Sequence, residues 1–332
     1  MFGLRSFFDM RKSGASKYRR GAQRPQQRRR KRIATVLAML SVLALAAGLY
    51  FTFDISGPFE AGSTGKIASK DAILKAWTSG DKAAVLDLTR SSIESKPLDP
   101  FYLTYRGFAA FYSASEKPEG EEKTALLDES VLSLRKALAS GKALPAKAQT
   151  EYVLGKTYYA KGEPWYDLAV SYMESSLADG YGGSDGDEYL AALYAGLGRH
   201  ADAVGHYEKA LSRSRAELLL LAAAKSYIAT GDKAKAKTLL DEAVASGKDA
   251  TALQQARFLL GGLAEESGDF SGAEAQYQAA LDADPESAEA WYRMGLMYQY
   301  KNDPVRARAA WRKAAMLDPT HSGARQKLGE KL

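Results

Sequence analysis

The sequence predicts an all-α fold made of repeated pairs of short amphipathic helices, preceded by a single transmembrane helix. Three observations lead to this prediction. Helix-forming residues dominate, and few stretches alternate between apolar and polar residues with a period of two. Pro285 and Pro319 enclose two amphipathic segments separated by a polar break at residues 301–303. Residues 33–53 form an apolar segment that contains no charged side chain.

The chain begins with a basic tail, residues 1–32. The tail carries twelve Lys or Arg residues and one acid, Asp9, so its net charge is +11. Because the whole chain carries +6, the other 300 residues carry −5 (6 − 11). The tail ends in five consecutive cations, Arg28, Arg29, Arg30, Lys31 and Arg32. Cations directly before an apolar segment indicate its cytoplasmic end, and the polar tail itself is typical of a disordered segment.

Residues 33–53 are predicted to cross a membrane. As a helix, these 21 residues span about 31 Å, which matches the hydrocarbon core of a bilayer. Tyr50, Phe51 and Phe53 suit the interface at the far side. We therefore expect a cytoplasmic amino terminus, with everything after Asp54 outside the cytoplasm. In a bacterium this means a single-pass protein of the cell inner membrane whose carboxyl-terminal domain lies in the periplasm.

Two further features bear on this segment. Residues 44–46 are similar to a signal-peptidase site, which would make the segment a cleaved signal peptide. The apolar run continues for seven residues beyond that site, however, and favours a retained helix. Ser41, Ala44 and Gly48 are small residues of the kind that favour pairing of membrane helices, which indicates a homo-oligomer. Residues 54–65 contain Gly, Ser and Pro without periodicity and are expected to form a flexible linker.

The clearest repeat lies between Pro285 and Pro319, which are 34 residues apart. Aromatic and small residues recur there at fixed offsets, at Trp291, Met294, Gly295, Tyr298, Ala307, Trp311 and Ala314. This pattern resembles the tetratricopeptide repeat (TPR), with Met294 in the place of the usual Leu. The resemblance implies a right-handed α-solenoid, in which each unit is a pair of helices and neighbouring units stack.

The same frame can be followed back along the chain as far as residue 66. Residues 148–321 are predicted to form a TPR array, and residues 66–147 two degenerate TPR-like units, which makes about seven helix pairs. The unit that begins at residue 148 needs about two inserted residues near Pro164. Residues 322–332 are expected to form a polar capping helix, because the ends of a solenoid face solvent.

The repeated positions have mechanical roles. Small residues let the two helices of a unit approach closely, at Gly155, Ala191, Ala224, Gly261 and Gly295. Large residues fill the space between units, at Tyr207, Leu240, Tyr277 and Trp311. The Gly-Asp pairs at 231–232 and 268–269 supply a helix stop and then an acceptor that caps the next helix.

Function is therefore expected on the surface of the array. In TPR proteins the first helix of each pair lines a groove that binds a peptide or a helix of a partner protein. Carried over by position, the resemblance places in this groove Tyr152, Lys156, Tyr159, Leu218, Leu221, Lys225, Ile228, Gln255, Phe258, Tyr292, Leu296 and Gln299. Leu221, Ile228, Phe258 and Tyr292 would form an apolar strip for an amphipathic helix, or else only pack against their neighbours. The repeat is clearest far from the apolar segment, so the groove is expected in the distal units.

Patterns that carry catalysis or bind metals are absent from the sequence. The chain has no Cys, which excludes disulfides and thiol nucleophiles. Its three His residues, His200, His206 and His321, are not spaced to share a metal. The acidic, Gly-rich stretch 179–188 lacks the ligand order of a calcium loop and is expected to be a turn that caps the next helix. We expect no enzyme activity, no cofactor and no metal site.

These observations lead to two competing hypotheses. The first is a membrane-anchored scaffold whose extracytoplasmic groove binds segments of proteins in a cell-envelope complex. Secretion, flagellar-motor, cell-division and periplasmic chaperone systems are the settings that the resemblance suggests. In the second, the basic tail is the active part and binds anionic lipid or nucleic acid in the cytoplasm, while the array serves oligomerisation. Nucleic acid is disfavoured because the basic run directly precedes the apolar segment.

Overall fold

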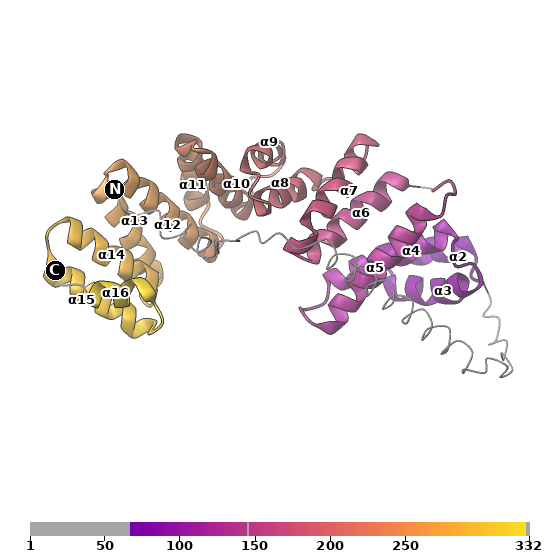
Figure 1. Ribbon diagram of the computed structural model, residues 1–332, viewed down its shortest axis with the longest axis horizontal. Helices are drawn as coiled ribbons and strands as arrows, with labels where there is room; N and C mark the ends of the chain where they lie inside the picture. Colours follow the sequence, from indigo (N-terminus) through magenta and orange to yellow (C-terminus); the bar gives the residue numbers. More distant parts are fainter. Residues whose placement is uncertain (1–66, 145, 330–332) are drawn as a thin grey trace, which may run out of the picture. The chain divides into compact units, whose positions relative to one another are not determined.

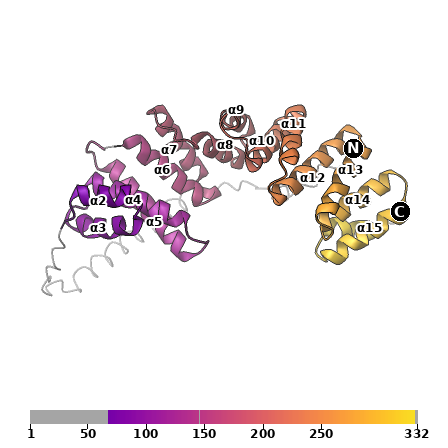
Figure 2. The ribbon, with the colours of Figure 1, turned by 180° about the vertical axis from the view of Figure 1, so that it is seen from behind.

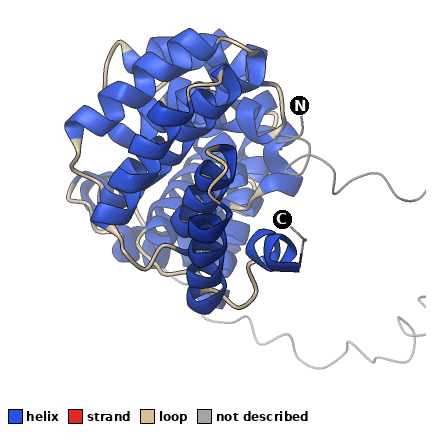
Figure 3. Ribbon diagram, turned by 90° about the vertical axis from the view of Figure 1, so that its left-hand side faces the viewer, coloured by secondary structure: helices blue, strands red, loops and turns tan. Residues whose placement is uncertain are grey.

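The computed structural model describes residues 67–329 apart from residue 145. These residues contain fifteen α-helices, one short 3₁₀ helix and no strand (Figure 1, Figure 3). The helices are α2 (Lys70–Thr78), α3 (Lys82–Ser95), α4 (Pro100–Ser115), α5 (Glu121–Ala139), α6 (Lys147–Ala160), η2 (Glu163–Trp165), α7 (Tyr166–Ala178), α8 (Gly186–Gly196), α9 (His200–Leu211), α10 (Glu217–Thr230), α11 (Lys233–Ser246), α12 (Ala250–Ser267), α13 (Phe270–Ala283), α14 (Ala288–Tyr300), α15 (Pro304–Leu317) and α16 (Ser322–Gly329).

Three of the predicted segments lie outside the described residues: the basic tail (1–32), the transmembrane helix (33–53) and the linker (54–65). Within the described part of the chain, no helix combines the length and the hydropathy needed to cross a membrane.

Successive helices of the described region form seven pairs, from α2 with α3 to α14 with α15, followed by α16. Each helix packs against its pair partner and then against the next helix in the chain, as Figures 1 and 2 show. The first helices of neighbouring pairs also contact one another directly from α2 to α12, whereas second helices make no comparable contact. The first helices therefore line a continuous surface. The prediction of an all-α solenoid of helix pairs is confirmed for this region.

The two helices of a pair meet where a small residue of the first helix faces a large residue of the second. A Cβ added at Gly155 would overlap the side chain of Met173, and one at Gly295 would overlap the indole ring of Trp311. A Cβ at Gly261 would likewise overlap the ring of Tyr277. Met173, Tyr277 and Trp311 are all at most 2% exposed. Close approach thus lets one large side chain fill the space between two helices without leaving a void.

The turns between helices show the predicted stop and cap. Gly231 and Gly268 have φ angles of 89° and 80°, the left-handed conformation that ends a helix. The carboxylate of the following residue, Asp232 or Asp269, then accepts a hydrogen bond from a backbone N–H in the first turn of the next helix. Asp303 caps α15 in the same way and follows Asn302, which also has a positive φ of 56°.

The acidic stretch 179–188 forms the predicted turn, but its side chains do not cap α8 as expected. Asp185 stands at the N-cap position of α8 and makes no side-chain capping bond. Its carboxylate instead accepts hydrogen bonds from Tyr152 and Lys156 of the preceding unit. A partly buried carboxylate gains more from a cation than from a single amide N–H. The side chain of Asp185 therefore joins two units instead of capping α8.

We expect Gly295→Ala to lower the free energy of unfolding by about 1–3 kcal/mol, because its Cβ would force the buried Trp311 ring out of place. Thermal unfolding followed by tryptophan fluorescence and circular dichroism measures this loss.

Gly262→Ala is the matched control. Gly262 lies one residue after Gly261 in α12, and a Cβ there meets no atom within 4 Å. The higher helix propensity of Ala predicts stabilisation by about 0.5–1 kcal/mol. Equal destabilisation by both changes would show that close helix approach does not determine the packing.

Candidate functional site

The first-helix surface contains a cavity of about 410 Å³ near the start of the described chain. We name it the aromatic groove. It lies among α2, α4 and α6 and the turn before α8. Its lining residues are Leu74, Trp77, Phe101, Thr104, Tyr105, Phe108, Tyr112, Ala146, Gln149, Val153 and Tyr181. The aromatic groove therefore belongs to the first three units, whereas the groove expected in the distal units stays a prediction.

A stripe of aromatic residues on α4 forms one wall of the groove. Phe101, Tyr105, Phe108 and Tyr112 are spaced by four, three and four residues, so they share one face of the helix. Trp77 of α2 packs against three of these rings, with centroid distances of 5.9 Å to Tyr105 and 5.8 Å to both Phe108 and Tyr112. Tilted and edge-to-face contacts of this kind hold each ring in place, so the wall is preformed.

The groove also contains a polar group without a partner. Thr104 lies between the aromatic positions of α4 and is 3% exposed. Its Oγ1 is the one buried side-chain oxygen or nitrogen among the described residues that makes no hydrogen bond. A buried hydroxyl left unpaired costs about 1–3 kcal/mol. Water or a polar group of a bound segment would remove that cost.

An ion pair surrounded by tyrosines lies beside the groove. Lys156 Nζ is 2.9 Å from Asp185 Oδ2, and the hydroxyl of Tyr152 donates to the same carboxylate. The Lys156 ammonium also lies over the Tyr189 ring, 4.6 Å from its centroid. The aromatic rings and the carboxylate both attract this cation, so they stabilise it although it is largely buried. We name Tyr152, Lys156, Asp185 and Tyr189 the lysine–tyrosine cluster.

Burial governs the electrostatics of this cluster. It lowers the pKa of Lys156 and raises the pKa of Asp185, because it disfavours the charged form of each group. Burial, followed by the nearby Asp185, raises the pKa of Tyr189 to about 12, so this phenol stays protonated. Burial also raises the pKa of Tyr112 in the groove, with smaller contributions from Tyr181 and Asp185. The negative charge of Asp185 thus disfavours the phenolate of Tyr112 in the groove.

Three of the predicted groove residues come together at this cluster. Tyr152 is 4% exposed and packs edge-to-face on Tyr181, with ring centroids 5.3 Å apart. Lys156 pairs with Asp185, as described above. Tyr159 stacks on Tyr166 and meets the edge of Tyr189. These side chains join α6 to its neighbours.

The predicted residues of the distal units are not gathered into one apolar strip. Leu221 is 3% exposed and belongs to the main core, and the half-buried Ile228 packs against that core. Phe258 packs on Tyr277 in a second core cluster. Tyr292 contacts His321 and lies close to Gly323, so the last helix covers it.

The remaining distal residues are polar, isolated or partly buried. Leu218 is 60% exposed. Lys225 Nζ donates to Gln255 Oε1 at 2.9 Å and thereby links α10 to α12. Leu296 and Gln299 are half-buried on α14. Whether these residues contact a partner stays a prediction.

The histidines have structural partners. His206 Nδ1 lies 2.9 Å from an Asp187 carboxylate oxygen, His200 meets Ser226, and His321 meets Glu289. Within residues 67–329, no group of three or more potential ligands is arranged to hold a metal ion.

Sequence comparison identifies the repeats in the carboxyl-terminal part of the chain. Three models of the tetratricopeptide repeat family match residues 221–274, 254–297 and 288–321. The chain therefore contains tetratricopeptide repeats, as the spacing of Trp291, Gly295 and Trp311 predicted. A search of curated proteins gave no match.

Solved structures show the same type of fold. The carboxyl-terminal part of a TPR repeat-containing protein from Cytophaga hutchinsonii is 16% identical, with a TM-score of 0.59 over 79% of this chain and 100% of that one. MamA is 19% identical, with a TM-score of 0.46, over 50% of this chain and 95% of that one. YrrB, a TPR protein with an unusual peptide-binding site, is 19% identical, with a TM-score of 0.37, over 73% and 97%. The first of these likenesses shows a TPR-type solenoid. Arrays of this type use their extended surfaces to bind proteins.

We expect Lys156→Met to destabilise the protein by about 1–2 kcal/mol at pH 7, because it leaves the partly buried Asp185 carboxylate without its cation. The folded-state pKa of Asp185 is already raised, so lowering the pH through that pKa neutralises the carboxylate. The deficit of the variant should therefore shrink as the pH falls. Chemical unfolding of both proteins from pH 7 to pH 4 measures it.

Lys225→Met is the control, because Lys225 is an exposed lysine on a first helix that bonds to a neutral glutamine. It should change stability by less than about 0.5 kcal/mol at every pH. A Lys156→Met deficit that is constant with pH would contradict the role given to Asp185.

Proposed function

We propose that this protein is a membrane-anchored scaffold that holds a segment of a partner protein in the aromatic groove. The groove is the observation that carries the proposal. It is preformed, about 410 Å³ in volume, lined by six aromatic side chains and supplied with an unpaired hydroxyl. Rigid aromatic side chains in a pocket are the residues that dominate binding energy at protein interfaces.

The shape and chemistry of the groove favour a peptide segment with one or two large apolar side chains. A volume of this size accommodates such side chains, and the polar edges of Tyr105, Tyr112 and Gln149 offer hydrogen bonds to its backbone. The neighbouring Lys156 is already neutralised by Asp185, so the segment needs no net charge of its own.

The sequence of residues 28–53 supports the membrane anchor in this proposal. Five cations precede 21 uncharged residues, so the amino terminus would lie in the cytoplasm and the solenoid outside it. The scaffold would then serve a cell-envelope complex in the inner membrane, of the secretion, flagellar-motor, cell-division or periplasmic chaperone kind. The absence of Cys is compatible with such a compartment.

Groove binding can be tested by capture with a photoreactive amino acid at Tyr112, which is 37% exposed in the groove. We expect one protein to be captured from native membranes, and its yield to fall about tenfold when Tyr105→Ala is added, because the aromatic wall is then interrupted. Leu218→Ala, at a 60% exposed position of the distal units, should leave the yield unchanged. Capture that resists Tyr105→Ala but fails with Leu218→Ala would place recognition in the distal units instead.

The anchor is tested separately by fusing reporters after Leu332. Alkaline phosphatase, which is active only outside the cytoplasm, should be active, and a reporter that needs the cytoplasm should be silent. Replacing residues 28–32 by Ser should reduce phosphatase activity, because the charge asymmetry that sets the orientation is lost. Activity of the cytoplasmic reporter alone in the unaltered fusion would overturn the orientation.

A further inference from the structure

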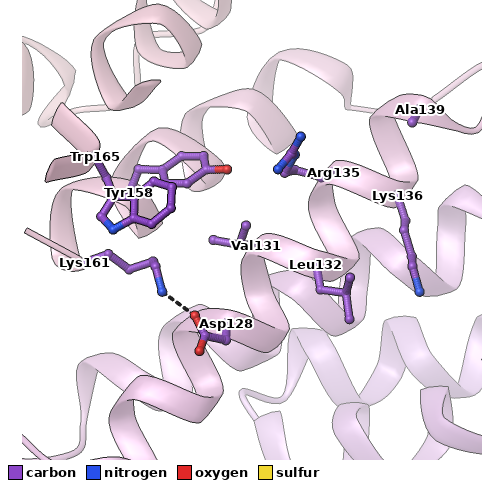
Figure 4. A pocket seen from close by; sticks show the side chains of 9 residues that line it. All are labelled: Asp128, Val131, Leu132, Arg135, Lys136, Ala139, Tyr158, Lys161 and Trp165. Atoms are coloured by element: carbon purple, nitrogen blue, oxygen red, sulfur yellow. Dashed lines mark hydrogen bonds and ion pairs between the residues drawn. The ribbon is translucent and has the colours of Figure 1, made fainter. Parts of the chain in front are cut away.

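A second cavity, of about 450 Å³, lies on a different part of the solenoid (Figure 4). It is formed by α5, the end of α6 and η2, and we name it the α5 pocket. Its lining residues are Asp128, Val131, Leu132, Arg135, Lys136, Ala139, Tyr158, Lys161 and Trp165. It shares no residue with the aromatic groove, and one of its sides is a second helix rather than a first helix.

An insertion in the repeat builds one wall of this pocket. The third unit is about two residues longer than the 34-residue repeat, and the extra residues lie near Pro164. There Gly162 adopts a φ of 95° and the chain forms η2. This short helix places Trp165 flat against Tyr158, with ring centroids 5.6 Å apart. Tyr158 is 1% exposed and belongs to the core, whereas Trp165 is 40% exposed. The insertion therefore presents an aromatic surface that the core does not require.

The apolar lining of the pocket includes residues of α5 as well as Tyr158 and Trp165. Leu132 is 51% exposed, and it lies one turn from Arg135 and Lys136 on the same helix. Figure 4 shows Val131 and Leu132 on the α5 side of the pocket and Trp165 and Tyr158 on the other side. An exposed tryptophan and an exposed leucine on opposite walls can hold one large apolar side chain between them.

The cations around this apolar lining differ in their partners. Lys161 pairs with Asp128 and lies over the Trp165 ring, 5.6 Å from its centroid. Arg135 and Lys136 are exposed, and no carboxylate of the described residues forms an ion pair with either of them. Arg135 lies beside the Tyr158 hydroxyl, where it opposes the rise in the pKa of that phenol caused by burial. Neither cation is paired with a carboxylate of the pocket lining, and Arg135 interacts only with the neutral Tyr158 hydroxyl in the pocket, so both can meet an incoming anion at the edge of an apolar surface.

We propose that the α5 pocket binds an acidic segment of a partner protein, with an aromatic side chain against Leu132 and Trp165 and one acidic side chain on each of Arg135 and Lys136. The guanidinium fork of Arg135 suits a carboxylate, and the ammonium of Lys136 adds a second donor. This site is independent of the proposed groove function. It would let the solenoid hold two protein segments at once.

The charges of the pocket favour an acidic peptide segment. The lining contains three cations, Arg135, Lys136 and Lys161, and one carboxylate, Asp128, so its formal charge is +2. Asp128 pairs with Lys161, which leaves Arg135 and Lys136 without a carboxylate partner among the lining residues. Acidic side chains of a peptide complement these two cations, and the cavity of about 450 Å³ has room for an apolar side chain beside them.

The test uses the full chain in an uncharged detergent and a blocked peptide, Gly-Asp-Phe-Glu-Gly, titrated by calorimetry. We expect one peptide to bind per chain. The double change Arg135→Ala and Lys136→Ala should weaken binding at least about tenfold, because it removes both carboxylate donors. Trp165→Ala should weaken it by a similar factor, and the melting temperature of the variant shows whether the fold is retained without the stacking of Trp165 on Tyr158.

The matched control is Arg312→Ala with Lys313→Ala, which removes two adjacent exposed cations from α15 and leaves the net charge the same as in the test variant. Unchanged binding in this control supports the proposal. Three results would overturn it: no binding of the peptide, equal weakening in the test and control variants, or equal binding of a peptide with Lys in place of both acids. Binding of monomeric dioctanoyl phosphatidylglycerol at Arg135 and Lys136 without binding of the peptide would assign the pocket to lipid instead.

Discussion

The structure depends on one repeated contact, in which a small residue of a first helix lies against a large residue of its second helix. Gly155 with Met173, Gly261 with Tyr277 and Gly295 with Trp311 are the plainest cases. Because the helices of a pair touch at this point, their remaining faces are free to stack on the next pair. First helices then contact first helices along the array, and the surface they form is available for binding.

Both candidate sites arise where the chain departs from this repeat. The aromatic groove uses the stripe on α4, in a unit that lacks much of the usual pattern, and the α5 pocket uses the inserted turn that carries Trp165. The regular distal units use their large side chains for packing, as Leu221 and Tyr292 show. A position that the repeat requires for stability has little surface left for a partner. Irregular units are therefore where recognition can be added at small cost to the core.

The fold was largely predictable from the sequence because its determinants are local. The Gly-Asp turns, the small residues and the 34-residue spacing act within one unit, and the structure agrees with them at Gly231, Asp269 and Gly295. The aromatic groove was not predicted, since it depends on side chains from three helices far apart in sequence. The spacing of Phe101, Tyr105, Phe108 and Tyr112 was a visible signal for it. The stretch 179–188 forms the predicted turn before α8, but no side chain caps that helix, because the carboxylate of Asp185 bonds to the buried Lys156 instead.

The central claim is that partner recognition lies on α2, α4 and α6 of the irregular units. Amide hydrogen exchange along the full chain, with and without a bound partner protein and without crosslinking, tests this claim most directly. We expect exchange to slow in α2, α4 and α6 while α10, α12 and α14 stay unchanged. Protection confined to α10, α12 and α14 would contradict the claim and show that the partner binds the distal repeats.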